Sequence, residues 1–117
     1  MPKNFSTVVE SILSRGIDME EFGSANWALC PEDALEALSK LHELGIPVLG
    51  GDVWEKRDGH PSLTLDNWFS RPKTDEPFAG FLERSIAEAR NYIRSYRPSG
   101  NVEYLFEIVV DRSAGLS

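Results

Sequence analysis

The stretch Val102-Glu103-Tyr104-Leu105-Phe106-Glu107-Ile108-Val109-Val110 carries the clearest structural signal in the sequence. Its side chains alternate between two faces, which predicts a β-strand. One face is wholly apolar or aromatic and consists of Val102, Tyr104, Phe106, Ile108 and Val110. The other face combines Glu103, Leu105, Glu107 and Val109. A strand with one strongly apolar face needs a covering layer, so this stretch predicts a sheet with helices packed on one side.

A long helix over residues 76–96 is predicted directly before this strand. Its apolar side chains recur at helical spacing and comprise Phe78, Phe81, Leu82, Ile86, Ala89, Ile93 and Tyr96. With a rise of about 1.5 Å per residue, the helix is roughly 30 Å long and can cross a small sheet. Residues 70–77 form a polar loop before it, and Thr74 or Asp75 is expected to cap its start.

Residues 46–56 and 62–69 predict a β-hairpin, because Asp58-Gly59 between them is a typical turn sequence. The pair Gly50-Gly51 interrupts the first strand. Adjacent glycines in a strand usually mark a bulge or a close approach of another part of the chain, and we expect a bulge here.

Two further helices are predicted nearer the N-terminus. Residues 31–44 begin with a proline and end before Gly45, and residues 4–15 carry an apolar stripe that ends before Gly16. Asn4 or Ser6 can cap the first of these two helices. Residues 17–30 show no clear periodicity and remain unassigned. The predicted fold is therefore a single α+β domain over residues 1–117, in the order α-α-β-β-α-β, with a mostly antiparallel three-stranded sheet and its helices on one face.

The composition excludes several classes of protein. The 117 residues include 12 Lys and Arg against 19 Asp and Glu, a net charge of −7, which argues against nucleic-acid binding. The single cysteine, Cys30, excludes an intrachain disulfide framework and a cysteine-rich zinc module. No apolar run is long enough for a membrane span, and the start lacks the apolar region of a signal peptide. We therefore expect a cytoplasmic protein without a membrane partner.

The negative charge is concentrated in one part of the chain. Residues 1–69 contain 5 basic and 12 acidic side chains, whereas residues 70–117 contain 7 of each. Three explanations remain open at this point: solubility, attraction of a cationic protein partner, and metal binding.

Candidate catalytic groups are few. His42, His60 and Cys30 belong to no metal-ligand spacing or nucleophile signature, so we expect no catalytic residue, no metal site and no cofactor. Asp52 and Asp66 could face each other across the hairpin, where they could hold a divalent cation, raise each other's pKa or point into solvent. A small metal-dependent enzyme that uses this pair is therefore an alternative hypothesis.

Two tryptophans accompany these aspartates. Trp54 and Trp68 could share a face of the hairpin with Asp52 and Asp66. An indole ring surrounded by carboxylates is a typical anchor of a protein–protein interface. A binding surface is therefore a second interpretation of the same residues.

Several segments together resemble the immunity protein 40 family of bacterial polymorphic toxin systems. They are Trp27-Ala28-Leu29, Pro31-Glu32-Asp33-Ala34-Leu35-Glu36-Ala37-Leu38, Gly50-Gly51-Asp52-Val53-Trp54, Asp66-Asn67-Trp68, Arg84-Ser85 and Ala89-Arg90-Asn91-Tyr92-Ile93. The resemblance implies a small, cytoplasmic, non-enzymatic α+β protein that binds and neutralises a cognate toxin. It supplies no catalytic residues and no assigned contact residues. Many such toxins are nucleases, whose surfaces are often basic.

The sequence thus predicts an immunity protein that uses an acidic surface with aromatic residues. The candidate toxin-binding residues are Asp18, Glu20, Glu21, Glu32, Glu36, Asp52, Trp54, Asp66 and Trp68. We expect a monomer or a weak homodimer. A homo-oligomeric structural module is the other alternative, because the strand 102–110 could pair with a copy of itself if it lay at a sheet edge with Leu105 and Val109 exposed.

Overall fold

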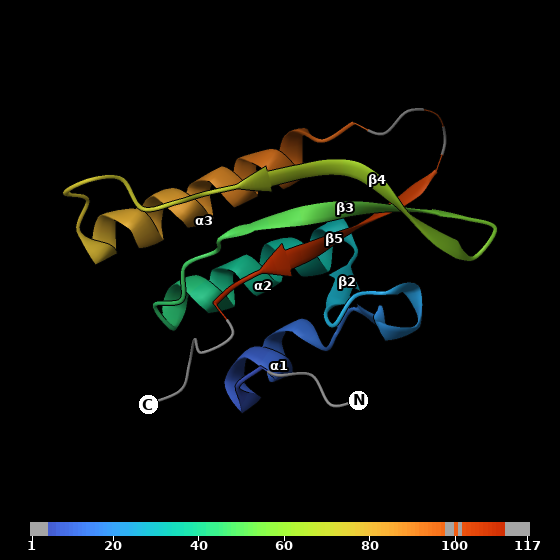
Figure 1. Cartoon of the computed structure of the whole chain (residues 1–117), viewed down its shortest axis with the longest axis horizontal. Helices are drawn as coiled ribbons and strands as arrows, with labels where there is room; N and C mark the ends of the chain where they lie inside the picture. Colours follow the sequence, from blue (N-terminus) through green and yellow to red (C-terminus); the bar gives the residue numbers. More distant parts are fainter. Residues whose placement is uncertain (1–4, 98–99, 101, 112–117) are drawn as a thin grey trace.

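The computed structural model describes residues 5–97, 100 and 102–111, and Figure 1 shows how their helices and strands are arranged. The helices and strands in chain order are α1 (Thr7–Leu13), β1 (Ile17–Asp18), the 3₁₀ helix η1 (Glu20–Phe22), β2 (Trp27–Leu29), α2 (Pro31–Glu43), β3 (Gly50–Arg57), β4 (His60–Phe69), α3 (Phe78–Ser95) and β5 (Glu103–Val109). The predicted α+β class is confirmed.

The sheet has five strands rather than the predicted three, in the order β1-β2-β5-β3-β4, and every neighbouring pair is antiparallel. The two additional strands, β1 and β2, fall in the unassigned segment 17–30. They contain two and three residues, too few for alternation to be visible in the sequence. Because β2 pairs with β5, the strand 102–110 lies inside the sheet and β4 is the edge strand on the hairpin side.

The three α-helices cover one face of the sheet, as expected (Figure 1). The main core lies between these helices and the sheet. Phe106 and Ile108 of β5 are fully buried there, together with Val53 of β3. Leu38 and Leu41 of α2 pack into the same cluster. Burial of these apolar side chains is the main force that holds the helices to the sheet.

The helix boundaries follow from local chemistry. Ser6 caps α1 by accepting a hydrogen bond from the Val9 N–H (3.3 Å), whereas Asn4 lies outside the described residues. Pro31 occupies the first turn of α2, and Gly45 follows this helix with a left-handed φ of 72°. The prediction for α3 is wrong at its start, because its N-cap is Pro77 and no side chain caps it. Asp75 instead occupies a left-handed turn position (φ 65°).

The glycine pair does not form the predicted bulge. Gly50 and Gly51 pair regularly with Phe69 and Trp68, and the register shifts only between Asp52 and Trp54. The extra residues belong to β4, where residues 64–66 lie opposite Val53 alone. Gly51 instead provides space for the Trp68 ring, which lies where a side chain at position 51 would stand.

A second, smaller apolar cluster lies on the face of the sheet opposite the helices, which we call the open face. The chain at Met19 and Phe22 folds over part of this face and covers Trp54 and Leu105. Cys30 packs at the margin of the cluster and is partly buried. Toward β4, no helix of the residues that the structure describes covers the open face (Figure 1).

None of the helices in the described part of the chain has the length and apolar character needed to cross a membrane.

Candidate functional site

The acidic candidate residues between positions 18 and 36 lie on two separate surfaces. Asp18 ends β1, and Glu20 and Glu21 form η1; together they line a shallow, open depression. The Asp18 carboxylate also accepts a hydrogen bond from the Glu20 N–H (2.9 Å), which fixes the turn into η1. These three carboxylates therefore form one exposed acidic group.

The second acidic surface is on α2 and is largely neutralised. Arg15 forms ion pairs with Asp33 (3.4 Å) and Glu36 (2.9 Å), and Lys40 also contacts Glu36 (3.5 Å). Glu32 is exposed in the first turn of the helix, where a negative charge is favourable against the helix dipole. A toxin that contacts Glu36 would therefore have to compete with Arg15 and Lys40.

Asp52 and Asp66 do not pair across the hairpin. Asp52 lies opposite Asn67 on β4 and opposite Glu107 on β5. Burial raises the pKa of the Asp52 carboxyl. Asp66 lies in the irregular part of β4 and accepts a hydrogen bond from the hydroxyl of Tyr96, the C-cap residue of α3 (2.8 Å). Burial and this bond raise the pKa of Tyr96 to about 12, so Tyr96 stays protonated and continues to donate at neutral pH.

The expectation that the two tryptophans share a face is wrong. Trp54 faces away from the helices in the second cluster and is only 7% exposed. Its indole N–H donates to the buried Glu107 carboxylate (3.0 Å). Trp68 lies on the helix side, where its ring stacks on Tyr92 of α3 with the centroids 4.7 Å apart. Both rings therefore support the fold from opposite sides of the sheet rather than standing free as anchors.

Three adjacent cross-strand rows form the part of the open face around Asp52, because directly paired residues of antiparallel strands point to the same side. The first row is apolar, the second is acidic, and the third has a phenylalanine at the sheet edge and a glycine at its centre. The rows are Leu63–Trp54–Leu105, Asn67–Asp52–Glu107 and Phe69–Gly50–Val109. The acidic row is thus bordered by apolar residues on both sides, and the ends of the rows at β4 are exposed.

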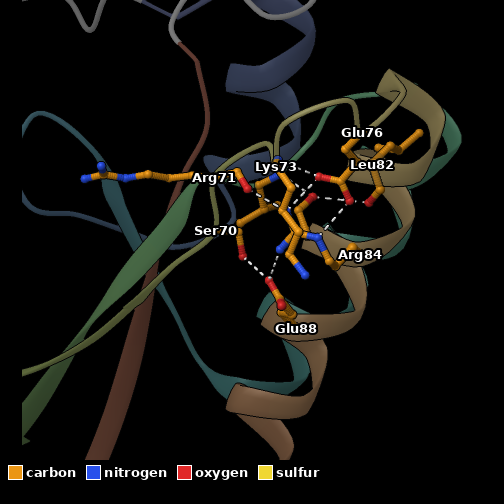
Figure 2. A network of polar contacts seen from close by, with 9 residues as sticks. Ser70, Arg71, Lys73, Glu76, Leu82, Arg84 and Glu88 are labelled. Atoms are coloured by element: carbon orange, nitrogen blue, oxygen red, sulfur yellow. Dashed lines mark hydrogen bonds and ion pairs between the residues drawn. The ribbon is translucent and has the colours of Figure 1, made fainter.

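A polar network that sequence reasoning did not identify holds the chain directly after β4 (Figure 2). The Arg84 guanidinium donates two hydrogen bonds to the Glu76 carboxylate (2.9 Å each) and one to Glu88 (3.0 Å). It also donates to the Arg71 carbonyl, and Glu88 accepts from the Ser70 hydroxyl (2.6 Å). Only the Arg84–Glu88 contact has a helical i,i+4 spacing that a sequence can reveal. The network fixes loop 70–77 on α3, and with it the end of β4.

The network predicts a specific acid sensitivity. The Arg84 side chain, followed by the Lys73 backbone N–H, lowers the pKa of Glu76 from 4.5 to about 2. The Glu76 carboxyl has a lower pKa in the folded than in the unfolded protein, so it stabilises the fold at a pH above 4.5. This contribution is lost as the pH decreases from 4.5 toward 2. We expect the Glu76 carboxyl resonance to titrate near pH 2, and Glu76→Gln to lose part of the pH dependence of unfolding in that interval. A Glu76 midpoint near 4.5 would contradict the network.

The remaining titratable groups form no catalytic arrangement in the described residues. His42 contacts Glu83 (2.8 Å) at the surface, and His60 is exposed at the start of β4. In residues 5–97, 100 and 102–111, no three His, Cys, Asp or Glu side chains are placed to hold a metal ion.

The fold and its surfaces are those of a small α+β domain with one helical face, one partly uncovered sheet face and an acidic N-terminal half. The family model of Immunity protein 40 matches residues 18–110. The chain therefore belongs to the Immunity protein 40 family. No curated protein and no solved structure matches the chain.

Proposed function

We propose that this chain is a non-enzymatic immunity protein that binds and neutralises a cognate bacterial polymorphic toxin domain in the cytoplasm. The match of the family model to residues 18–110 carries the proposal. The matched range contains the five strands of the sheet from Asp18 onward, together with α2 and α3. The family resemblance therefore extends over the scaffold and both faces of the sheet.

The charge distribution supports a cationic partner such as a basic nuclease domain. Residues 16–39 contain six acidic side chains, of which Asp33 and Glu36 pair with Arg15 and Lys40, while the other four are exposed: Asp18, Glu20, Glu21 and Glu32. A negative field of this kind accelerates association with a positive surface and selects against acidic partners. Of the nine candidate contact residues, the acidic ones fit this role, whereas Trp54 and Trp68 serve mainly to shape the sheet beneath them.

Co-expression tests the proposed function directly. The probe is the C-terminal domain of the protein encoded by the reading frame directly upstream. We expect this domain to arrest growth when it is expressed alone, and the present chain to restore growth and co-purify with it. A chain that neither binds this domain nor protects the cells would overturn the proposal.

The dependence on salt tests the electrostatic part of the proposal. Exposed charges are screened over a Debye length that falls from about 14 Å to about 4 Å between 50 and 500 mM salt. We expect the association rate with the toxin domain to decrease about tenfold over this range, while the dissociation rate changes less. Stopped-flow fluorescence measures both rates. A salt-independent association rate would exclude electrostatic steering by the acidic surface.

A further inference from the structure

We propose that the toxin docks on the open face of the sheet and that one of its lysine or arginine side chains pairs with Asp52, between Leu63 and Phe69. This inference rests on the proposed function and adds the location of the interface and the chemistry of the partner segment. That segment carries a cation with apolar side chains on either side of it.

Asp52 is the central observation. It lies in the middle of the acidic row, half-buried, and no described residue donates a hydrogen bond or a cation to its carboxylate. Its neighbour Glu107 is already engaged by Trp54 and by the Ser24 hydroxyl (2.9 Å). A partly desolvated carboxylate without a partner is costly in the free protein, and a cation supplied from outside would remove that cost.

The edge strand β4, which pairs with the strand of Asp52, carries unusually exposed apolar residues. Leu63, Leu65 and Phe69 are 46%, 78% and 70% exposed, and they account for three of the six large apolar side chains exposed in the described part of the chain. All three belong to the edge strand β4. Gly50 adds no side chain between Phe69 and Val109, so the acidic row is open on that side. Clustered apolar residues around a polar centre are typical of protein interfaces.

The backbone conformation of β4 places the Leu65 side chain in solvent. Leu65 has a φ of 76°, a left-handed conformation that is strained for a branched residue. The Thr64 hydroxyl donates to the Val53 carbonyl (2.9 Å) and accepts from the Asp66 N–H (3.0 Å). The Asn67 amide donates to the Leu65 carbonyl (3.1 Å). These bonds hold the strained position and direct Leu65 into solvent, where it contributes nothing to the core.

Charge complementarity identifies the occupant as a cationic segment rather than a second copy of this chain. Among the described residues, carboxylates outnumber cations on the open face and on the chain around it, with Glu20, Glu21, Asp52, Glu103 and Glu107 against Lys56 and Arg71. Lys56 lies opposite Glu103, and Arg71 lies over the Phe69 ring (5.3 Å), so neither of these two cations pairs with Asp52. A two-fold contact through this face would bring the two Asp52 rows together, and like charges at such a contact are repulsive.

Substitution of Asp52 tests the central ion pair. Asp52→Asn keeps the shape of the side chain and removes its charge, and we expect the dissociation constant for the upstream-encoded toxin domain to rise at least about tenfold. Asp58→Asn is the matched control, because it removes the same charge from the tip of the same hairpin at a left-handed position (φ 51°) that asparagine tolerates. We expect the control to change the dissociation constant by less than about twofold. Equal effects of the two variants would overturn the proposal.

The apolar flanks are tested by Leu63→Ala and Phe69→Ala. Both side chains are exposed in the free protein, so thermal stability should hardly change. We expect each variant to raise the dissociation constant about tenfold, mainly through faster dissociation. Hydrogen exchange of the complex should show new protection in residues 50–57 and 60–69 and none on the exposed side of α3.

The outcomes separate this inference from the proposed function. If the wild-type chain binds the toxin domain but these variants bind equally well, the open face is excluded and the immunity function stands. If the wild-type chain does not bind at all, the proposed function itself fails. The other possible occupant of the open face is a second copy of this chain, and light scattering of the free protein at about 100 µM tests for such a dimer. A dimer that Phe69→Ala dissociates would overturn the assignment of this face to the toxin.

Discussion

Replacement of Gly51 by alanine is expected to lower the free energy of unfolding by about 3 kcal/mol. A Cβ atom at this position would overlap the Trp68 ring and would approach the Glu107 carbonyl oxygen to 2.5 Å. The ring cannot easily withdraw, because it is stacked on Tyr92 and meets the edge of Phe106. The carbonyl belongs to the central strand, whose pairing with β3 and β2 fixes it. Urea denaturation measures the difference.

Gly80→Ala provides the matched control for this prediction. Gly80 lies in α3, and a Cβ atom there meets only ordinary contacts, the closest at 3.5 Å to the Pro77 side chain. Alanine favours the helix over glycine by about 0.5–1 kcal/mol, so this variant should be more stable than the wild type. If Gly51→Ala were as stable as Gly80→Ala, the close packing of Trp68 on β3 would be refuted.

The same packing explains one part of the fold that the sequence could not reveal. The hairpin was predictable from its turn and its apolar residues, but the face on which Trp68 lies depends on what it opposes. The ring needs the empty position at Gly51, and so it lies on the helix side while Trp54 lies on the other. A bulky residue opposite a glycine on a neighbouring strand was the signal available, and the predicted bulge at Gly50-Gly51 concealed it.

The number of strands in the sheet could not be predicted from the sequence either. The long helix, the helix that begins at Pro31 and the strand 102–110 each show a periodicity long enough to identify. β1 and β2 exist because the free edge of β5 binds them, and such short strands carry no pattern of their own. Their presence places β5 inside the sheet, so the edge pairing considered for the strand 102–110 is not available.

The charged residues of the candidate site were easier to predict as a group than as individuals. The acidic character of the first 69 residues follows from composition alone. Which carboxylates have partners depends on distant parts of the chain, such as Arg15 beside Glu36 and Tyr96 beside Asp66. Asp52 differs from these because the strand register gives it Asn67 and Glu107 as neighbours and no cation.

Glu107→Ala is expected to lower the free energy of unfolding by about 3 kcal/mol. Glu107 is 7% exposed, and one of its carboxylate oxygens accepts hydrogen bonds from the Trp54 indole (3.0 Å) and the Ser24 hydroxyl (2.9 Å). Alanine would leave the buried indole N–H without an acceptor and would release the chain near η1 from the sheet. Urea denaturation gives the loss of stability, and hydrogen exchange of residues 17–24 reports the local release.

Glu107→Gln separates the hydrogen bonds from the charge. The glutamine amide oxygen can still accept from Trp54 and Ser24, so this variant should retain at least half of the stability that alanine removes. It lacks one charge of the acidic row, so it should also bind a cationic toxin segment more weakly than the wild type does, although it is folded. Asp52→Asn also removes one charge from the acidic row, but Asp52 takes part in neither of these two hydrogen bonds. If Glu107→Gln were as unstable as Glu107→Ala, the carboxylate charge rather than its acceptor role would hold Trp54 and Ser24 in place.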